Sequence, residues 1–173
     1  MFSSIHFLVA ILAAMSTQTK NRAMETLASL GFALPTAPKP VASYVPSVQT
    51  GKLLIVSGQL PFRDGTLIAT GKVPSVVSLE MAQECARQCI LNALAVVAGE
   101  SRTLDHVVRI VRVGVFVACD DGFADQPKVA NGASDLLQQV FGEAGRHARA
   151  AVGTNALPLN ACVEIEMMVE VAS

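Results

Sequence analysis

The C-terminal part of the sequence places three carboxylates at alternate positions. In residues 161–171 apolar side chains fill one set of positions, while Glu164, Glu166 and Glu170 fall in the other set. Because the side chains of a β-strand alternate between two faces, the three carboxylates would share one face. Two interpretations fit this pattern. It is either a solvated outer face, or a site in which a partly desolvated glutamate has a raised pKa and exchanges a proton with water or substrate.

Arg149 lies in the preceding predicted strand, fifteen positions before Glu164. Its guanidinium offers a planar fork of donors that matches a carboxylate bidentately. We expect the last two strands to form a hairpin in which Ala156 pairs with Ala161. In that register Arg149 lies opposite Met168 and shares the face of Glu164, about 13 Å away along the strand. A shift of one residue would separate them onto opposite faces. Together the two side chains could hold a small acid and hydrate its C=N bond.

The rest of the chain predicts a sheet that carries two helices. Ser78 is a good N-cap for a long helix that ends at Gly99, with apolar residues at three- and four-residue steps. Residues 104–119 are apolar at both alternating sets of positions, which predicts a central strand covered on both sides. The order β-β-(β)-α-β-α-β-β predicts an α+β fold with two helices packed on one face of the sheet. The expected elements are a helix over 17–30, a Pro-rich connector over 35–40, strands over 41–48, 52–57, 66–69 and 104–119, helices over 78–99 and 128–140, and strands over 149–156 and 161–171.

Six short motifs follow one another along the chain. They are SYV at 43–45, GKLLIVSGQLP at 51–61, VFV at 115–117, ARAAV at 148–152, LP at 157–158 and VEIE at 163–166. In order and spacing they resemble the YjgF/RidA (Rid) family, which also carries the names L-PSP endoribonuclease and translation inhibitor. The resemblance implies a chorismate-mutase-like fold and a homotrimer with active sites in clefts between subunits. It also implies hydrolysis of 2-aminoacrylate-type enamines and imines to 2-keto acids and ammonia, as by a 2-iminobutanoate/2-iminopropanoate deaminase, with no metal or cofactor.

The resemblance assigns the two central roles to residues already singled out. Arg149 matches the arginine that binds the carboxylate of the substrate, and Glu164 matches the glutamate that orients water. Ala151 stands where the best-studied members have a cysteine, so we expect altered substrate contacts rather than inactivity. The segment before Asn131 and the N-terminal extension are also longer than is usual, which indicates a divergent branch whose substrate differs.

Other residues match positions that complete the pocket of the family. These are Tyr44, Ser57 and Asn131, while Gly58 would allow a bulge or a close backbone approach. Each also has a simpler interpretation: Tyr44 as a half-buried strand aromatic, Ser57 as support for a strand end and Asn131 as a helix cap. His147, two positions before Arg149, is interpreted as a strand-edge residue rather than a base.

Composition narrows the classes of function. A chain of 173 residues fits one domain, which we place at 41–173 after an extension at 1–40. The net charge of −1, the scattered Lys and Arg and the absence of Trp argue against nucleic acid as a partner, and so against ribonuclease activity. The first alternative to a deaminase is a non-catalytic protein that binds small carboxylates in the same cleft, and a ribonuclease or translation inhibitor is the less favoured second alternative.

The first fifteen residues and the four cysteines indicate the cellular compartment of the protein. The apolar run at 7–15 is too short to span a bilayer and follows no Lys or Arg, so we interpret residues 1–14 as an appendage rather than a signal peptide. The cysteines have neither C-x-x-C spacing nor the density of a disulfide scaffold, which favours free thiols in a reducing compartment. We therefore expect a cytoplasmic protein that does not associate with membranes.

Overall fold

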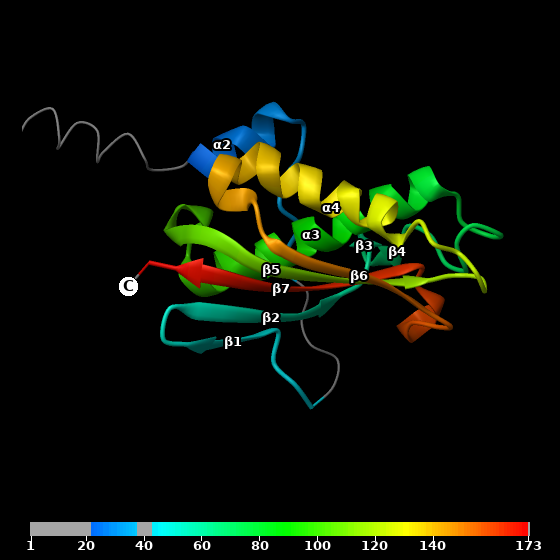
Figure 1. Cartoon of the computed structure of the whole chain (residues 1–173). Helices are drawn as coiled ribbons and strands as arrows, with labels where there is room; N and C mark the ends of the chain where they lie inside the picture. The colour runs from blue at the N-terminus through cyan, green and yellow to red at the C-terminus, as the bar shows by residue number, and fades with distance from the viewer. Residues whose placement is uncertain (1–21, 38–42, 173) are drawn as a thin grey trace, which may run out of the picture.

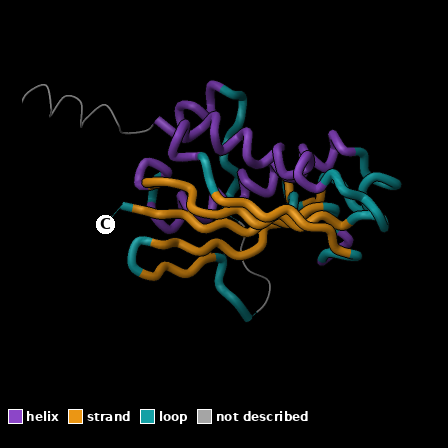
Figure 2. The backbone as a smooth tube through the Cα atoms, viewed as in Figure 1, coloured by secondary structure: helices purple, strands orange, loops and turns teal. Residues whose placement is uncertain are grey.

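A five-stranded sheet carries its helices on one face. The computed structural model describes residues 22–37 and 43–172, and its strands follow the spatial order β1-β2-β7-β5-β6. Figure 1 shows α2, α3 and α4 on one side of this sheet, and Figure 2 shows the same two layers by element type. The predicted α+β class is confirmed. The elements are α2 (Arg22–Ser29), β1 (Ser47–Thr50), β2 (Leu53–Gln59), β3 (Phe62–Arg63), β4 (Thr66–Leu67), α3 (Leu79–Ser101), β5 (Val107–Ala118), α4 (Gln126–Phe141), β6 (Ala148–Thr154) and β7 (Val163–Val171), with single turns at Leu104–His106, Gly142–Gly145 and Pro158–Asn160.

Helix α3 forms as its sequence pattern predicts. Ser78 caps it, since the Ser78 hydroxyl accepts a hydrogen bond from the Met81 amide at 3.2 Å. The positions that recur at three- and four-residue steps are buried among the side chains of the core. The helix runs past Gly99 to Ser101 and is followed by Arg102 in the left-handed region. Helix α4 covers the neighbouring part of the sheet, with Val129, Leu136 and Leu137 buried.

Strand β5 is central, but it is covered on one face. Its neighbours are β7 and β6. Val113, Val115 and Val117 are buried on the side of the helices. On the opposite face, no element among residues 22–37 and 43–172 covers Arg112 or Phe116, which are both partly exposed. The prediction of a strand covered on both sides was therefore wrong for the single chain, because apolar residues on both faces do not distinguish helix packing from an unfilled apolar face.

The last two strands do not form a hairpin, so that prediction was wrong. Strand β6 pairs in parallel with β5, whereas β7 lies between β2 and β5 and is antiparallel to both. The cause is the connection through α4, which returns the chain to the start of β5 and so makes β6 parallel to it. Residues 155–162 then cross the end of β5 to reach its other edge. The alternation of apolar and polar residues along β6 and β7 does not show which strands lie beside them, so it could not exclude a hairpin.

The N-terminal segments differ from their predicted bounds. Strand β1 begins at Ser47 rather than Val41, and Thr50 pairs with Leu53 around a two-residue turn that contains Gly51 at φ +58°. The predicted helix is present from Arg22, with Ala23 and Leu27 buried in the main core. Residues 17–21, 38–42 and the apolar run at 7–15 lie outside the described residues.

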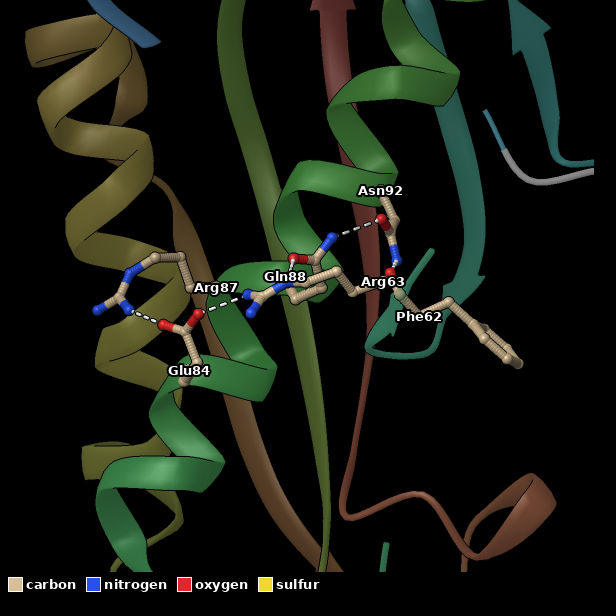
Figure 3. A network of polar contacts seen from close by, with 6 residues as sticks. All are labelled: Phe62, Arg63, Glu84, Arg87, Gln88 and Asn92. Carbon is tan, nitrogen blue, oxygen red and sulfur yellow. Dashed lines mark hydrogen bonds and ion pairs between the residues drawn. The ribbon is translucent and has the colours of Figure 1, made fainter. Parts of the chain in front are cut away.

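A polar network fastens the small β3–β4 ribbon to α3 (Figure 3). The Arg63 guanidinium donates to Gln88 Oε1 at 3.0 Å and to Glu84 Oε1 at 2.6 Å, and Arg87 pairs with the second oxygen of Glu84. Gln88 donates to Asn92 at 3.0 Å. Asn92 in turn donates to the carbonyls of Leu60 and Phe62 at 2.9 and 3.0 Å. The network therefore fixes the backbone that directly follows Gly58.

Candidate functional site

Glu164 lies on the uncovered face of the sheet, here called the open face. Strand β7 alternates between buried and partly exposed residues, and Glu164 belongs to the partly exposed set. The pKa of its carboxyl is raised, first by burial and then by the charge of Glu166. A carboxylic acid with a raised pKa can exchange protons closer to neutral pH than an ordinary glutamate.

Gly58 makes room for this carboxylate. A Cβ added at Gly58 would overlap Glu164 Oε1. The register of β2 against β7 shifts between Val56 and Gln59, so Ser57 and Gly58 form a bulge. The predicted bulge and close approach at Gly58 are both confirmed. Only a residue without a side chain allows the Glu164 carboxylate to lie against this backbone.

The other carboxylates share the open face with Glu164, as the alternation predicts. Glu166 accepts a hydrogen bond from Arg112 Nη1 at 2.6 Å. Gly114 lies beneath it, since a Cβ there would come within 2.7 Å of Glu166 Oε1. Glu170 lies further along, opposite Leu53 and Arg109. Glu166 is therefore held in an ion pair with Arg112, whereas Glu164 forms no ion pair with a cation among residues 22–37 and 43–172.

Tyr44 and Ser57 lie at the same end of the structure as Glu164. The Ser57 hydroxyl donates to the carbonyl of Val45 at 2.8 Å, and the Ser57 amide donates to that of Pro46 at 2.9 Å. These bonds hold the segment that carries Tyr44, whose side chain is 51% exposed. Ser57 thus supports its neighbours, and Tyr44 is about half exposed but lies in a bend before β1 rather than in a strand.

Arg149 lies on the opposite face, the one that the helices cover. It pairs with Val113 in β5, whose side chain is buried under the helices. Arg149 Nη1 donates to Asn131 Oδ1 at 2.9 Å and to Ser134 Oγ at 3.0 Å, and both acceptors belong to α4. Asn131 is therefore a direct partner of Arg149 rather than a helix cap. Ala151, two residues on, points to the same side and packs against the core.

A shallow hollow of about 380 Å³ surrounds Arg149, between α4 and the start of β6. It is polar and carries charges of both signs, since Arg146 and Arg149 face Asp135. Its wall is made of Asn131, Ser134, Asp135, Gln138, Arg146, His147 and Arg149. Four of these residues were not identified from the sequence: Ser134, Asp135, Gln138 and Arg146. Ser134 could have been identified from the sequence, because it lies one helical turn after Asn131 and therefore on the same face of α4.

His147 is half-buried in this hollow and is more than a strand-edge residue. Its Nε2 lies 3.1 Å from Ser134 Oγ, and its Nδ1 lies 2.6 Å from the carbonyl oxygen of Gly145. Burial lowers the pKa of the ring, the charge of Arg149 lowers it further, and the hydrogen bond to Gly145 raises it. His147 shares the face of Arg149 because the two are two positions apart.

The predicted site residues thus fall into two groups in one chain. Glu164, Gly58, Ser57 and Tyr44 belong to the open face and the β1–β2 end. Arg149, Asn131 and Ala151 belong to the side of the helices. The hairpin geometry that was expected to unite Arg149 with Glu164 does not exist.

The remaining reactive side chains lie in the core. Cys85, Cys89, Cys119 and Cys162 are free and buried. Burial raises the pKa of the Cys89 thiol, which makes it a poor nucleophile. Within residues 22–37 and 43–172, no three His, Cys, Asp or Glu side chains are placed to hold a metal ion. In the same part of the chain, no helix is long and apolar enough to cross a membrane.

Comparisons with known proteins agree on one family. The family described as "YjgF/chorismate_mutase-like, putative endoribonuclease" matches residues 24–171. Protein TCP17 of Trypanosoma cruzi is 42% identical over 90% of this chain and 98% of its own. A 2-iminobutanoate/2-iminopropanoate deaminase of Dermatophagoides farinae is 31% identical over 78% of this chain and 91% of its own. The crystal structure of Atu1372 from Agrobacterium tumefaciens, a protein of unknown function, superposes with a TM-score of 0.82 at 42% identity and covers 90% of this chain and 95% of that one.

Proposed function

Since this chain belongs to the YjgF/RidA family, we propose that it is a hydrolase that converts 2-aminoacrylate-type enamines and imines to 2-keto acids and ammonia. The observation that carries the proposal is the half-buried Glu164, whose raised pKa and contact with Gly58 suit a group that handles a proton and a water. The name of the deaminase from Dermatophagoides farinae supports the same reaction class.

Each step of this reaction has a candidate residue. The carboxylate of the substrate pairs with Arg149, whose Nη1 is held by α4 and whose Nε and Nη2 make no hydrogen bond to the described residues. Water adds to the carbon of the C=N bond, and Glu164 takes a proton from it and passes that proton to the nitrogen, which gives a carbinolamine. The proton of the new hydroxyl then moves to the nitrogen by way of Glu164 as the C–N bond breaks and the C=O bond forms. Ammonia leaves and the keto acid remains, so the atoms balance as imine plus water.

The two groups of residues must come from different subunits for this reaction to occur. Arg149 and Glu164 lie on opposite faces of the sheet in one chain, so a complete site needs a second copy. The open face offers exposed apolar side chains for such a contact, namely Val48, Leu53, Ile55 and Val152. We therefore place the site between subunits of a homotrimer. The buried free thiols suit a cytoplasmic location.

The test is keto-acid release from 2-aminoacrylate generated in the assay. The purified protein should accelerate release, and Arg149→Ala should abolish the acceleration. Arg22→Ala is the matched control, because Arg22 is exposed on α2 and does not line the hollow around Arg149. Equal rates for the wild type and Arg149→Ala would refute the assignment.

A second candidate function is binding of a small carboxylate without turnover. The separation of Arg149 from Glu164 within one chain favours it, because a single chain then offers an anchor without a proton-handling group. Calorimetric binding of a keto acid, combined with no effect on the hydrolysis of any imine, would support this alternative.

A further inference from the structure

Arg149 begins a series of hydrogen bonds in which the donor and the acceptor of each bond can be assigned. Arg149 Nη1 donates to Ser134 Oγ at 3.0 Å. The hydroxyl hydrogen of Ser134 needs an acceptor of its own, and His147 Nε2 lies 3.1 Å away. His147 Nδ1 is 2.6 Å from the Gly145 carbonyl, which can only accept, so Nδ1 carries the proton. In a neutral ring Nε2 is then an acceptor, and all donors point one way, from Arg149 to Gly145.

Because Ser134 and His147 are at least partly buried, this series of hydrogen bonds restrains the Arg149 guanidinium more than a surface contact would. Ser134 is 7% exposed and lies in the interior of α4. His147 is half-buried, and burial lowers the pKa of its ring, which favours the neutral form. Because Ser134 and Asn131 both engage Nη1, the guanidinium is held by one nitrogen. Its Nε and Nη2 donors are left for a planar, bidentate ligand.

We propose that Ser134 and His147 are positioning residues that hold the Arg149 guanidinium ready for a carboxylate of the substrate, through the hydrogen-bond chain Arg149 to Ser134 to His147 to Gly145. The inference rests on the proposed function only in taking Arg149 as the carboxylate anchor. It adds two residues that no motif of the sequence singled out for this role. Their contribution lies in substrate binding rather than in proton transfer, since neither is placed at Glu164.

The hydrogen-bond chain also couples ligand binding in the hollow to the protonation of His147. The charged groups around the ring are Arg149 from β6, Arg146 before that strand and Asp135 from α4. The charge of Arg149 lowers the pKa of His147. A protonated ring would carry a second proton on Nε2, which could then no longer accept from Ser134, so the restraint on Arg149 needs the neutral ring. Binding and protonation are reciprocal, so a ligand that needs the neutral ring should lower the pKa of His147, and affinity should decrease as the pH falls through that pKa.

The experiment measures calorimetric binding of 2-oxobutanoate to the full chain, together with KM and kcat for imine hydrolysis. Ser134→Ala should weaken binding and raise KM by about tenfold, the value of one hydrogen bond to a charged group, with kcat within about twofold. Ser134→Thr, which keeps a hydroxyl, should recover much of the affinity. His147→Leu should resemble Ser134→Ala, whereas His147→Gln, which keeps an acceptor, should lose less. Ser101→Ala removes a hydroxyl of α3 that bonds to Val97 and is the matched control.

The outcomes separate this inference from the proposed function. If Arg149→Gln abolishes binding while Ser134→Ala and His147→Leu bind as tightly as wild type, the positioning roles are refuted and the anchor stands. If Arg149→Gln itself binds normally, the anchor fails and the positioning roles fail with it. An NMR titration of the His147 ring adds a readout that a purely structural role would not move: 2-oxobutanoate should lower its pKa, and an unchanged or raised pKa would overturn the linkage.

Discussion

Arg149 and Glu164 lie on opposite faces of the same sheet, separated by the single strand β5. Val113 pairs with Arg149 on one side, and Phe116, three residues along, pairs with Glu164 on the other. Since faces alternate with every residue, this odd offset sends the two side chains in opposite directions. A site that uses both residues therefore has to be assembled from two copies of the chain.

Mixing two inactive variants tests this assembly. Arg149→Gln and Glu164→Gln should each be inactive alone. In the proposed trimers, reassembled from an equal mixture, one site in four would pair an intact Arg149 with an intact Glu164 from the neighbour, so about a quarter of wild-type activity should return. Mass spectrometry of the intact assembly would confirm subunit exchange. No recovery after confirmed exchange would show that each site takes both residues from one chain.

Gly58→Ala tests the contact between the β2 bulge and Glu164. The added methyl group overlaps the Glu164 carboxylate, which must move, so kcat should fall by about 10² or more, as when a catalytic group is misplaced by about 1 Å. Gly99→Ala in α3 is the control, because nothing lies near its Cβ position. That control should retain activity and gain about 0.5–1 kcal/mol in the free energy of unfolding. Normal turnover by Gly58→Ala would argue against Glu164 as the proton-handling group.

Glu166→Gln should shift the pH dependence of hydrolysis. Activity that requires ionised Glu164 is lost as the pH falls through the pKa of that carboxyl, which burial and the charge of Glu166 both raise. Removing the charge of Glu166 lowers this pKa, so the acid limb of kcat/KM should move to lower pH. Glu170→Gln, further along the same face, should move it less. An acid limb that moves to higher pH, or equally in both variants, would contradict this electrostatic account.

Asn92→Leu should destabilise the fold through the polar network of Figure 3. The substitution leaves the carbonyls of Leu60 and Phe62 and the amide of Gln88 without their partner. Buried polar groups without partners cost about 1–3 kcal/mol, which urea denaturation would measure as a lower free energy of unfolding. Gln139→Leu, at an exposed position of α4, should change it by less than about 0.5 kcal/mol. Equal losses in both variants would mean that the network adds no stability.

Local sequence patterns were enough to predict the main helices and strands and several local features. The apolar periodicity and Ser78 predict α3, alternation puts Glu164, Glu166 and Glu170 on one face, and Gly58 signals a bulge, all as the structure has them. The first two features follow from the residue period of a helix or a strand, and the third follows from the missing side chain of glycine. All three depend only on residues close together in the sequence.

Which strands are neighbours, and therefore which side chains meet, depends on the tertiary structure. The segment through α4 places β6 beside β5 and leaves β7 between β2 and β5, so Arg149 faces Asn131 and Ser134 instead of Glu164. Alternation along a strand shows which of its side chains share a face, but it does not show which other strand lies beside it in the sheet. The Arg149 to His147 chain likewise joins α4 to β6 across thirteen residues, from Ser134 to His147, and depends on how the helix lies over the strand.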